Sequence, residues 1–441
     1  MKARYRYRFY PSSQQQHSLA QMFGCVRVVW NDALALCKQS DKKPSSADLQ
    51  KIVITQAKNT EERAWLGDVS CIPLQQSVAD LDVAFKNFFN SCKGKRKGSK
   101  VGYPKFKKRT NSQSARFRVG GFSIKGDGVY LAKIGIVNPI RSRKLPSEPS
   151  SVTVIKDCAN RYFLSFVVEI QPIQTEAKNP SIGIDLGIKT FAVMSNGEKA
   201  ESPSYKKLDR KVCKLQRKLA RQPKDSKRRN VTRMRIAKLH NQIGDSRKDF
   251  LHKLSTKVIN ENQVIVLEDL NVSGLVKNRK LSRAISQQGW YEFRTLCEAK
   301  SEKFGREFKV ISRWEPTSQI CSDCGFKWGK IDLSIRSVLC LSCGTEQDRD
   351  ENAARNIAQV GMGNRHDFKR AQRDCETTSV ARPDEASRIT AALAGVSISS
   401  SHPIIPPTNK ARHNLNSMPS QCSGDNKFAI DNVLPLKTAR I

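Results

Sequence analysis

The feature of this chain that most constrains its folding is a set of four cysteines in two Cys-x2-Cys pairs, with fifteen residues between the pairs. A glycine follows each pair, as the tight turn of a metal-binding knuckle requires. This spacing is typical of a zinc ribbon, in which four thiolates complete a tetrahedral shell and leave no open position for water. We therefore expect one structural Zn²⁺, in preference to four unrelated free thiols, bound by Cys321, Cys324, Cys340 and Cys343.

The other nine cysteines are scattered singly from Cys25 to Cys422, unlike the framework of a disulfide-rich secreted protein. The first thirteen residues lack the apolar core of a signal peptide, and no apolar run is long enough to span a bilayer. We therefore expect a cytoplasmic protein that makes no membrane contact.

The charge of the chain predicts a polyanionic partner. Its 441 residues, enough for two or three domains, contain 78 Lys and Arg against 41 Asp and Glu, a net charge of +37. Such an excess exceeds what solubility needs and is typical of proteins that bind nucleic acid. A ribosomal-type coating protein has the same charge as an enzyme that cuts, so charge by itself leaves both classes open.

Two segments concentrate the positive charge. Residues 91–109 alternate cations with glycines, Tyr103 and Phe106, which suits a loop along a nucleic-acid backbone. Residues 206–239 hold 15 Lys and Arg against only two acids, with leucines at helical spacing, and predict a basic helical hairpin. A solvated, salt-bridged surface is the alternative, but the acids are too few to pair the cations. The predicted contacts are Lys95, Arg96, Lys105, Lys107, Lys108, Arg109, Lys218, Arg221, Arg228 and Arg229.

The patterning along the chain predicts several domains of a mixed α+β and α/β class. A strand period in residues 1–10 and short strands in 111–175 predict one β-rich domain, into which a helical domain, 11–110, is inserted. An apolar α/β domain is expected over 181–316 and 347–360, interrupted by the ribbon at 317–346. The tail, 361–441, has no Trp or Tyr and many Ser, Pro and Asn residues, and we expect it to be disordered.

Three acids stand where chemistry is expected. Asp185 ends the apolar strand SIGID, Glu268 ends QVIVLE, and Asp350 opens the helix DENAARNI. Each alone could be a helix cap or a routine strand-end acid. Together they match what a two-metal phosphodiesterase needs, namely carboxylate oxygens for two Mg²⁺ or Mn²⁺ ions that activate water and stabilise the leaving 3′ oxygen. Their order along the chain is that of an RNase H-like nuclease core.

Other readings of the acids stay open at this point. One alternative is an RNase H-like fold without catalytic activity, and the presence of all three acids disfavours it. Asp269 and Asp348 are close enough in sequence to compete for the ligand roles. We prefer Asp350 because Asn352 then follows within the same helical turn and is expected to support the site.

The motifs GIDLGIKTFAVMSNG, VIVLEDLNVSGL and CSDCG to CLSCGTEQDRDENAARNI resemble the TnpB family of transposon-encoded proteins. The resemblance covers most of residues 1–360. It implies an RNA-guided DNA endonuclease with a split RuvC-like domain, and the family is related to the compact type V CRISPR effector nucleases. By motif it assigns Asp185, Glu268 and Asp350 to the catalytic metal site and places the zinc ribbon just before the last RuvC segment. It also implies a wedge domain, a recognition domain, a guide RNA from the element's end and a double-stranded DNA target, bound by a monomer in a ribonucleoprotein. The resemblance further implies a prokaryotic source and a place at the nucleoid when the protein is bound to DNA.

Three rival functions remain at this stage. A transposase of the same element would need other residues: no His-x-His pair occurs, and the order Asp, Glu, Asp differs from the Asp, Asp, Glu of cut-and-paste enzymes. A guided DNA-binding protein that never cuts is disfavoured by the intact acids. A CRISPR effector proper would differ mainly by an array beside its gene.

Overall fold

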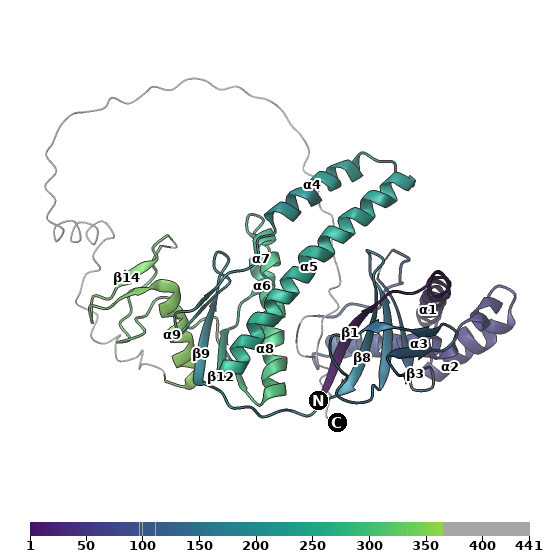
Figure 1. Cartoon of the computed structure of the whole chain (residues 1–441), viewed down its shortest axis with the longest axis horizontal. Helices are drawn as coiled ribbons and strands as arrows, with labels where there is room; N and C mark the ends of the chain where they lie inside the picture. The colour runs from purple at the N-terminus through teal and green to yellow at the C-terminus, as the bar shows by residue number, and fades with distance from the viewer. Residues whose placement is uncertain (97, 99, 111, 333, 365–441) are drawn as a thin grey trace, which may run out of the picture.

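The computed structural model describes residues 1–364, apart from positions 97, 99, 111 and 333, as a mixed α and β protein (Figure 1). The predicted disordered tail lies outside the described residues except at its start. There, Gly361 and Met362 still belong to the helix α9 (Arg349–Met362). In the described part of the chain, no helix is long and apolar enough to cross a membrane.

The N-terminal sheet has the order β2-β7-β8-β1-β6. The first strand, β1 (Lys2–Phe9), pairs antiparallel along its whole length with β8 (Tyr162–Glu169), which is more than 150 residues away in sequence. Its aromatic residues Tyr7 and Phe9 are buried, as its alternating pattern predicts. The remaining strands are β2 (Gln113–Arg118), β6 (Pro139–Ile140) and β7 (Ser151–Lys156), and a separate small sheet contains β3 (Phe122–Lys125), β4 (Gly128–Leu131) and β5 (Gly135–Val137).

The chain between β1 and β2 is helical. A capping box of Ser12 and Gln15 begins α1 (Ser13–Gln39), which packs against α3 (Cys71–Cys92). Between them lie α2 (Ser46–Gln50), the π-helix η1 (Lys51–Gln56) and the 3-10 helices η2 (Ala57–Asn59) and η3 (Ala64–Asp68). Buried residues of these helices and of the N-terminal sheet form one continuous core, so the helices cover the sheet rather than enclosing a core of their own.

The C-terminal sheet has the order β11-β10-β9-β12-β13. The strands β9, β12 and β13 run parallel, whereas β10 and β11 form an antiparallel extension beyond β9. Parallel strands need both faces covered, and the apolar run of β12 fits that need. The bounds are β9 (Asn179–Leu186), β10 (Ala192–Met194), β11 (Lys199–Ala200), β12 (Asn262–Glu268) and β13 (Glu307–Ile311).

Different helices cover the two faces of this sheet (Figure 1). Ile265 and Leu267 of β12 face the core shared with α5 (Lys227–Glu261) and α8 (Trp290–Phe304), whereas Val264 and Val266 face α9. Gly183 in β9 lets α9 approach closely, because a Cβ there would overlap the backbone of Ala354 and Ala358. Gly361 in α9 plays the reciprocal role against Val266.

The other elements lie outside this layer. The helix α4 (Lys206–Ala220) and the first half of α5 form a hairpin that projects beyond the sheet (Figure 1). Short helices α6 (Val272–Leu275) and α7 (Ser282–Gln288) connect β12 to α8. The strands β14 (Ser337–Leu339) and β15 (Glu346–Asp348) pair in the cysteine-rich segment, and β15 runs directly into α9.

We predict that Gly183→Ala destabilises the protein by about 1–3 kcal/mol, because an added methyl group must displace the backbone of α9. Thermal unfolding followed by circular dichroism measures the effect. The control is Gly244→Ala in α5, where nothing lies within 4 Å of the added Cβ. That change should be neutral or stabilising by up to about 1 kcal/mol. Equal unfolding midpoints for the two variants would contradict the packing described for α9.

Candidate carboxylate site and cysteine ribbon

Two of the predicted carboxylates lie on neighbouring parallel strands. Ile184 pairs with Leu267, so the next residues, Asp185 and Glu268, lie side by side at the carboxyl ends of β9 and β12. Side chains alternate between the two faces of a strand. Asp185 therefore shares a face with Gly183, and Glu268 shares a face with Val266, which is the face that α9 covers.

Asp350 joins them from the helix that covers that face. Asp348 is the N-cap of α9, and its side chain accepts hydrogen bonds from the backbone N–H groups of Asp350 and Glu351 at 2.9 and 3.1 Å. This cap fixes Asp350 in the first turn, where the positive end of the helix dipole favours a carboxylate.

The three acids act on one another electrostatically. Burial, followed by the charge of Asp350, raises the pKa of Asp185 from 3.8 to about 6. Burial, followed by the charge of Asp185, raises the pKa of Glu268 from 4.5 to about 7. The second contribution to each shift places Asp350 near Asp185 and Asp185 near Glu268, because a like charge disfavours ionisation only at short range. The structure thus brings together the three predicted residues in an excess of negative charge.

The acids are neighbours without forming a closed cluster of ligands. Within the described residues, the four cysteines are the only group of at least three His, Cys, Asp or Glu side chains whose ligand atoms all lie within 4.8 Å of one another. The Asp350 carboxylate accepts hydrogen bonds of 2.9 and 3.2 Å from the Arg336 guanidinium. Arg336 precedes β14, and its carbonyl accepts from the N–H of Arg349. No sequence signal gave this isolated arginine a role, because only the tertiary fold brings it to the acid.

The two competing acids are engaged elsewhere. Asp348 caps α9 and pairs with Lys199 at 2.7 Å, which favours its ionised form and keeps its pKa low despite burial. Asp269 is held by Arg313 and, at 2.6 Å, by Arg294, and hydrogen bonds from these two guanidiniums lower its pKa. Both acids are therefore neutralised by the protein itself, in contrast to Asp185 and Glu268.

The four cysteines gather as their spacing predicts. The Sγ atoms of Cys321 and Cys343 are 3.8 Å apart, and those of Cys324 and Cys340 are 3.5 Å apart. The glycine after each pair has a left-handed backbone, with φ of 79° and 73°, and its N–H donates to the carbonyl of the first cysteine of its pair. Hydrogen bonding with Thr345 lowers the pKa of Cys343 to about 6, whereas burial raises the pKa values of Cys321 and Cys340.

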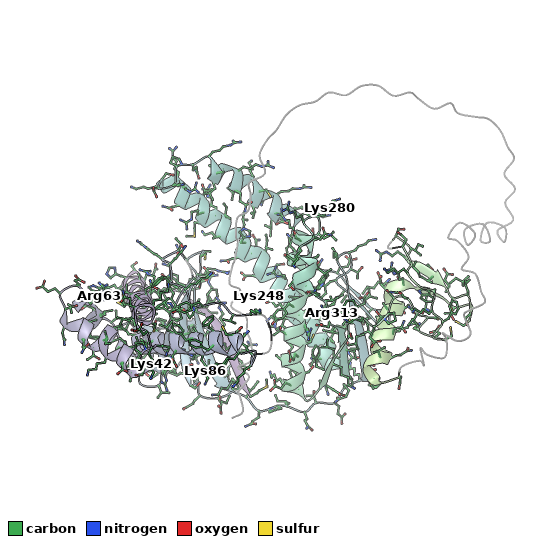
Figure 2. The ribbon with its side chains drawn as sticks, turned by 180° about the vertical axis from the view of Figure 1, so that it is seen from behind. Lys42, Arg63, Lys86, Lys248, Lys280 and Arg313 are labelled. Atoms are coloured by element: carbon green, nitrogen blue, oxygen red, sulfur yellow. The ribbon has the colours of Figure 1, made fainter. Side chains whose placement is uncertain are left out.

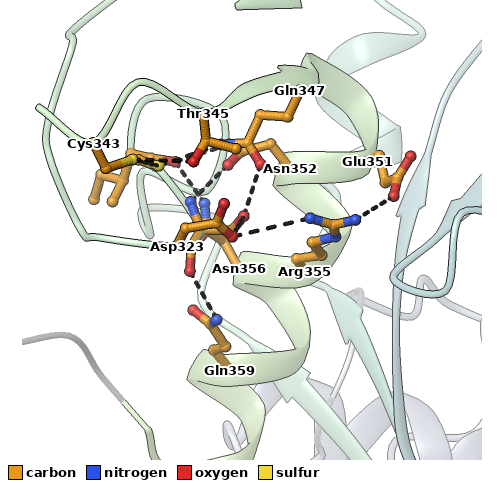
Figure 3. A network of polar contacts seen from close by, with 12 residues as sticks. Asp323, Cys343, Thr345, Gln347, Glu351, Asn352, Arg355, Asn356 and Gln359 are labelled. Carbon is orange, nitrogen blue, oxygen red and sulfur yellow. Dashed lines mark hydrogen bonds and ion pairs between the residues drawn. The ribbon is translucent and has the colours of Figure 1, made fainter. Parts of the chain in front are cut away.

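A ladder of amide side chains joins α9 to the first cysteine knuckle (Figure 3). Asn352 accepts from the N–H of Ser322 at 2.7 Å and donates to the carbonyl of Ile320 at 2.8 Å. One turn later, Asn356 donates to the carbonyls of Ile320 and Thr317, both at 2.7 Å. The expectation that Asn352 supports the carboxylate site is therefore corrected, because its fully buried amide holds the knuckle instead.

Eight of the ten predicted nucleic-acid contacts are exposed, and two are turned inward. The ammonium of Lys107 lies 3.9 Å from the centre of the Trp30 ring, and its backbone exchanges hydrogen bonds with Asn31. Arg229 donates to the carbonyls of Leu219 and Gln222 and so closes the hairpin between α4 and α5. Sequence spacing could not distinguish these inward cations from their exposed neighbours. The exposed set is Lys95, Arg96, Lys105, Lys108, Arg109, Lys218, Arg221 and Arg228.

These features define a basic, mixed α and β protein in which an acid-bearing parallel sheet is joined through one helix to a four-cysteine ribbon. Three family models match the chain: "Helix-turn-helix domain" at residues 1–43, "Probable transposase" at 165–279 and "Cas12f1-like, TNB domain" at 290–357.

Two full-length relatives and one solved structure extend the comparison. A Streptomyces pristinaespiralis protein named "Putative RNA-guided DNA endonuclease" is 41% identical over 82% of this chain and 90% of its own length. Escherichia coli InsQ, which bears the same description, is 30% identical over 81% of this chain and 92% of its own length. The Cas12f1 chain of a complex with sgRNA and target DNA covers 78% of this chain and 81% of its own length, at 14% identity and a TM-score of 0.46, a likeness too weak to assign function. The chain belongs to the TnpB family.

We predict that Glu268→Gln changes the stability of the metal-free protein in a pH-dependent way. Below about pH 4.5 the wild-type acid is protonated both folded and unfolded, so the two proteins should be equally stable. As the pH rises toward 7, the unfolded state releases its proton first, and the wild type loses stability that the glutamine variant keeps. Chelated samples unfolded in urea at pH 4.5, 6 and 8 measure this. The exposed Glu61→Gln is the control, and a pH-independent difference at Glu268 would contradict the raised pKa.

We predict that Asn352→Asp weakens the junction between α9 and the first knuckle by about 1–3 kcal/mol. The new carboxylate still accepts from Ser322, but it replaces the amide donor that faces the carbonyl of Ile320. Amide hydrogen exchange over residues 318–324 should accelerate. Asn87→Asp, the same change on an exposed face of α3, should leave this exchange unaltered. Unchanged protection in the Asn352 variant would show that the ladder does not hold the knuckle.

Proposed function

We propose that this protein is an RNA-guided DNA endonuclease of a mobile element, which cuts DNA beside a short motif. The observation that carries the proposal is the meeting of Asp185, Glu268 and Asp350, whose charges act on one another at one edge of the parallel sheet. The names of the two relatives support it, as does the net charge of +37.

The C-terminal sheet supports the proposal of an RNase H-like, RuvC-type core. An Asp at the end of one strand, a Glu at the end of its parallel neighbour and an Asp in the first turn of the covering helix occur in the expected chain order. We assign residues 181–316 and 347–360 to this nuclease domain and 317–346 to the ribbon. The β-rich segments 1–10 and 111–175 then form the wedge domain, and 11–110 the recognition domain.

The carboxylate site fits divalent cations. Its residues offer only oxygen ligands, and burial, followed by the charge of a neighbouring carboxylate, raises the pKa values of Asp185 and Glu268. We assign Asp185, Glu268 and Asp350 as the residues that would hold two Mg²⁺ or Mn²⁺ ions. When bound, such ions supply a water nucleophile at neutral pH and stabilise charge on the leaving oxygen.

The protein's own residues would position the substrate and the acids. Asp348 holds the first turn of α9 in place, and Arg336 fixes the position of the Asp350 carboxylate through its two hydrogen bonds. Gly187, which follows the Asp185 strand, leaves the backbone beside that acid free of a side chain. The arrangement therefore holds the three carboxylates ready before substrate arrives.

The four cysteines fit one Zn²⁺ in a closed site. All four ligands are sulfur, and each knuckle has its glycine turn, so the ion would be structural. The side-chain amides of Asn352 and Asn356 attach the first knuckle to α9, which also bears Asp350. The positions of the ribbon and of Asp350 are therefore coupled. We infer that the ribbon orients α9 and borders the path of the substrate.

The exposed cations would grip the nucleic acids. Side chains line both helices of the projecting α4–α5 hairpin (Figure 2), where acids are scarce. A guide RNA paired with target DNA needs only recognition of its shape and backbone, because base pairing supplies the sequence specificity. We propose a monomer that binds guide RNA and double-stranded target DNA in one ribonucleoprotein.

We predict that alanine at Asp185, Glu268 or Asp350 reduces guided cleavage by more than about one hundredfold, because even an outer-shell partner of a metal typically contributes ten- to one-hundred-fold. RNA binding should stay near that of the wild type, since each change removes a ligand and no positive charge. The protein is expressed with its native flanking DNA, the co-purified RNA is sequenced, and the complex is incubated with a matching DNA library and Mg²⁺.

The control for these variants is Asp127→Ala, at a fully exposed acid in the turn between β3 and β4. It should cut as the wild type does. Undiminished cutting by all three site variants would refute the site assignment. A discrete RNA with no cutting by the wild type would identify a guided binding protein, and the absence of any RNA would favour a transposase or a simple DNA-binding protein.

A further inference from the structure

Trp314 is exposed to an extent that packing does not explain. Its side chain is 86% exposed, more than any other large apolar side chain in the described part of the chain. An indole gains free energy when its faces are covered, and tryptophan is enriched where a flat partner binds. An indole that stands free in the folded chain therefore suggests a ligand that covers it.

The position of Trp314 links it to the carboxylate site. Ile311, the last residue of β13, pairs with Glu268, and its carbonyl accepts from the N–H of Asp269 at 3.1 Å. Trp314 follows three residues later, where the chain leaves this edge of the sheet. The neighbouring Arg313, labelled in Figure 2, lies close enough for its charge to act on Glu268.

The loop that bears Trp314 is held at both ends. Arg313 pairs with Asp269 at its start, and the carbonyl of Thr317 at its end accepts from Asn356 of α9 at 2.7 Å. Between these anchors, the backbone N–H of Trp314 donates to the Ser312 hydroxyl at 3.3 Å, and the backbone N–H of Glu315 donates to the Ser312 carbonyl at 3.2 Å. The exposed indole is therefore presented by an ordered turn that is tied to two elements of the carboxylate site.

We propose that Trp314 is a stacking platform for one unpaired base of the DNA strand that enters the carboxylate site. The inference rests on the proposed nuclease function and names a substrate contact for it. A flat aromatic face accepts any base, which suits an enzyme whose sequence specificity lies in its guide. The strongly positive chain and the adjoining acid site favour a nucleic acid over a protein as the occupant.

The stacked base would hold the strand in register with the acids. A base fixed on an anchored loop limits where the neighbouring phosphodiesters can lie, so the bond to be cut reaches the carboxylates more often. Trp314 is in this sense a positioning residue. Its loss should raise KM for DNA and lower kcat/KM while the acids remain intact.

The first test is photo-cross-linking of the full-length protein with its guide RNA. Target strands carry 5-iododeoxyuridine at one position at a time, and cross-linked peptides are identified by mass spectrometry. We expect a cross-link at Trp314 from one or two neighbouring positions, lost in Trp314→Leu and kept in Trp65→Leu, the control at a partly exposed tryptophan far along the chain. Cross-links confined to other residues would overturn the platform.

The second test removes the base instead of the tryptophan. In the wild type, an abasic site at the cross-linked position should reduce kcat/KM about tenfold, within the range for one stacked base. Trp314→Leu should lose about tenfold on intact DNA and nothing more on the abasic strand, whereas Trp314→Phe should keep most of the activity. An equal abasic penalty in wild type and Trp314→Leu would overturn the platform.

The two tests separate failure of the platform from failure of the nuclease proposal. Guided cutting with no contribution from Trp314 overturns the platform alone. A Trp314 cross-link in a wild-type complex that never cuts would support the platform and overturn the nuclease function, because cross-linking needs no cleavage.

Discussion

The close packing of α9 on the parallel sheet is the contact on which the candidate site depends. Gly183 and Gly361 remove the side chains that would hold this helix away from β9 and β12. The approach places Asp350 beside Asp185 and, through the amides of Asn352 and Asn356, attaches the first cysteine knuckle to the same helix. A looser contact would move Asp350 and the first cysteine knuckle away from the sheet at the same time, because both are attached to α9.

Charge is distributed in two opposite ways over the molecule. At the sheet edge, burial and neighbouring carboxylates raise the pKa values of Asp185 and Glu268, and the nearby Arg336 pairs with Asp350 alone. On the surface, cations far outnumber acids, most clearly along the α4–α5 hairpin. A polyanion would be attracted by the surface and repelled by bare acids, which supports the proposal that divalent cations bind at the sheet edge. The contrast between the basic surface and the acidic sheet edge is the physical basis on which we propose a metal-dependent nuclease.

Local sequence pattern predicted more of the site than of its surroundings. The apolar strands before Asp185 and Glu268 and the helix after Asp350 were visible because strand and helix periods differ. The sequence did not reveal the arginines that lie near these acids, Arg336 and Arg313, since both reach them only through folding. The same limitation misassigned Asn352, whose buried amide serves the knuckle. It also left Lys107 and Arg229 among the presumed surface cations, although one packs on Trp30 and the other closes a helical hairpin.

The sequence by itself determined the cysteine spacing, the order of the three acids, the family and the positive charge, because these are properties of residue type and separation along the chain. Only the tertiary structure decided which acids lie near one another, which polar side chains are already engaged and that Trp314 is exposed just after β13, the strand that pairs with the strand of Glu268. The reason is that strand register and helix docking join segments far apart in the sequence, such as those of Asp185 and Asp350. Contacts over such separations follow from burial of the whole sheet, and no local pattern encodes them.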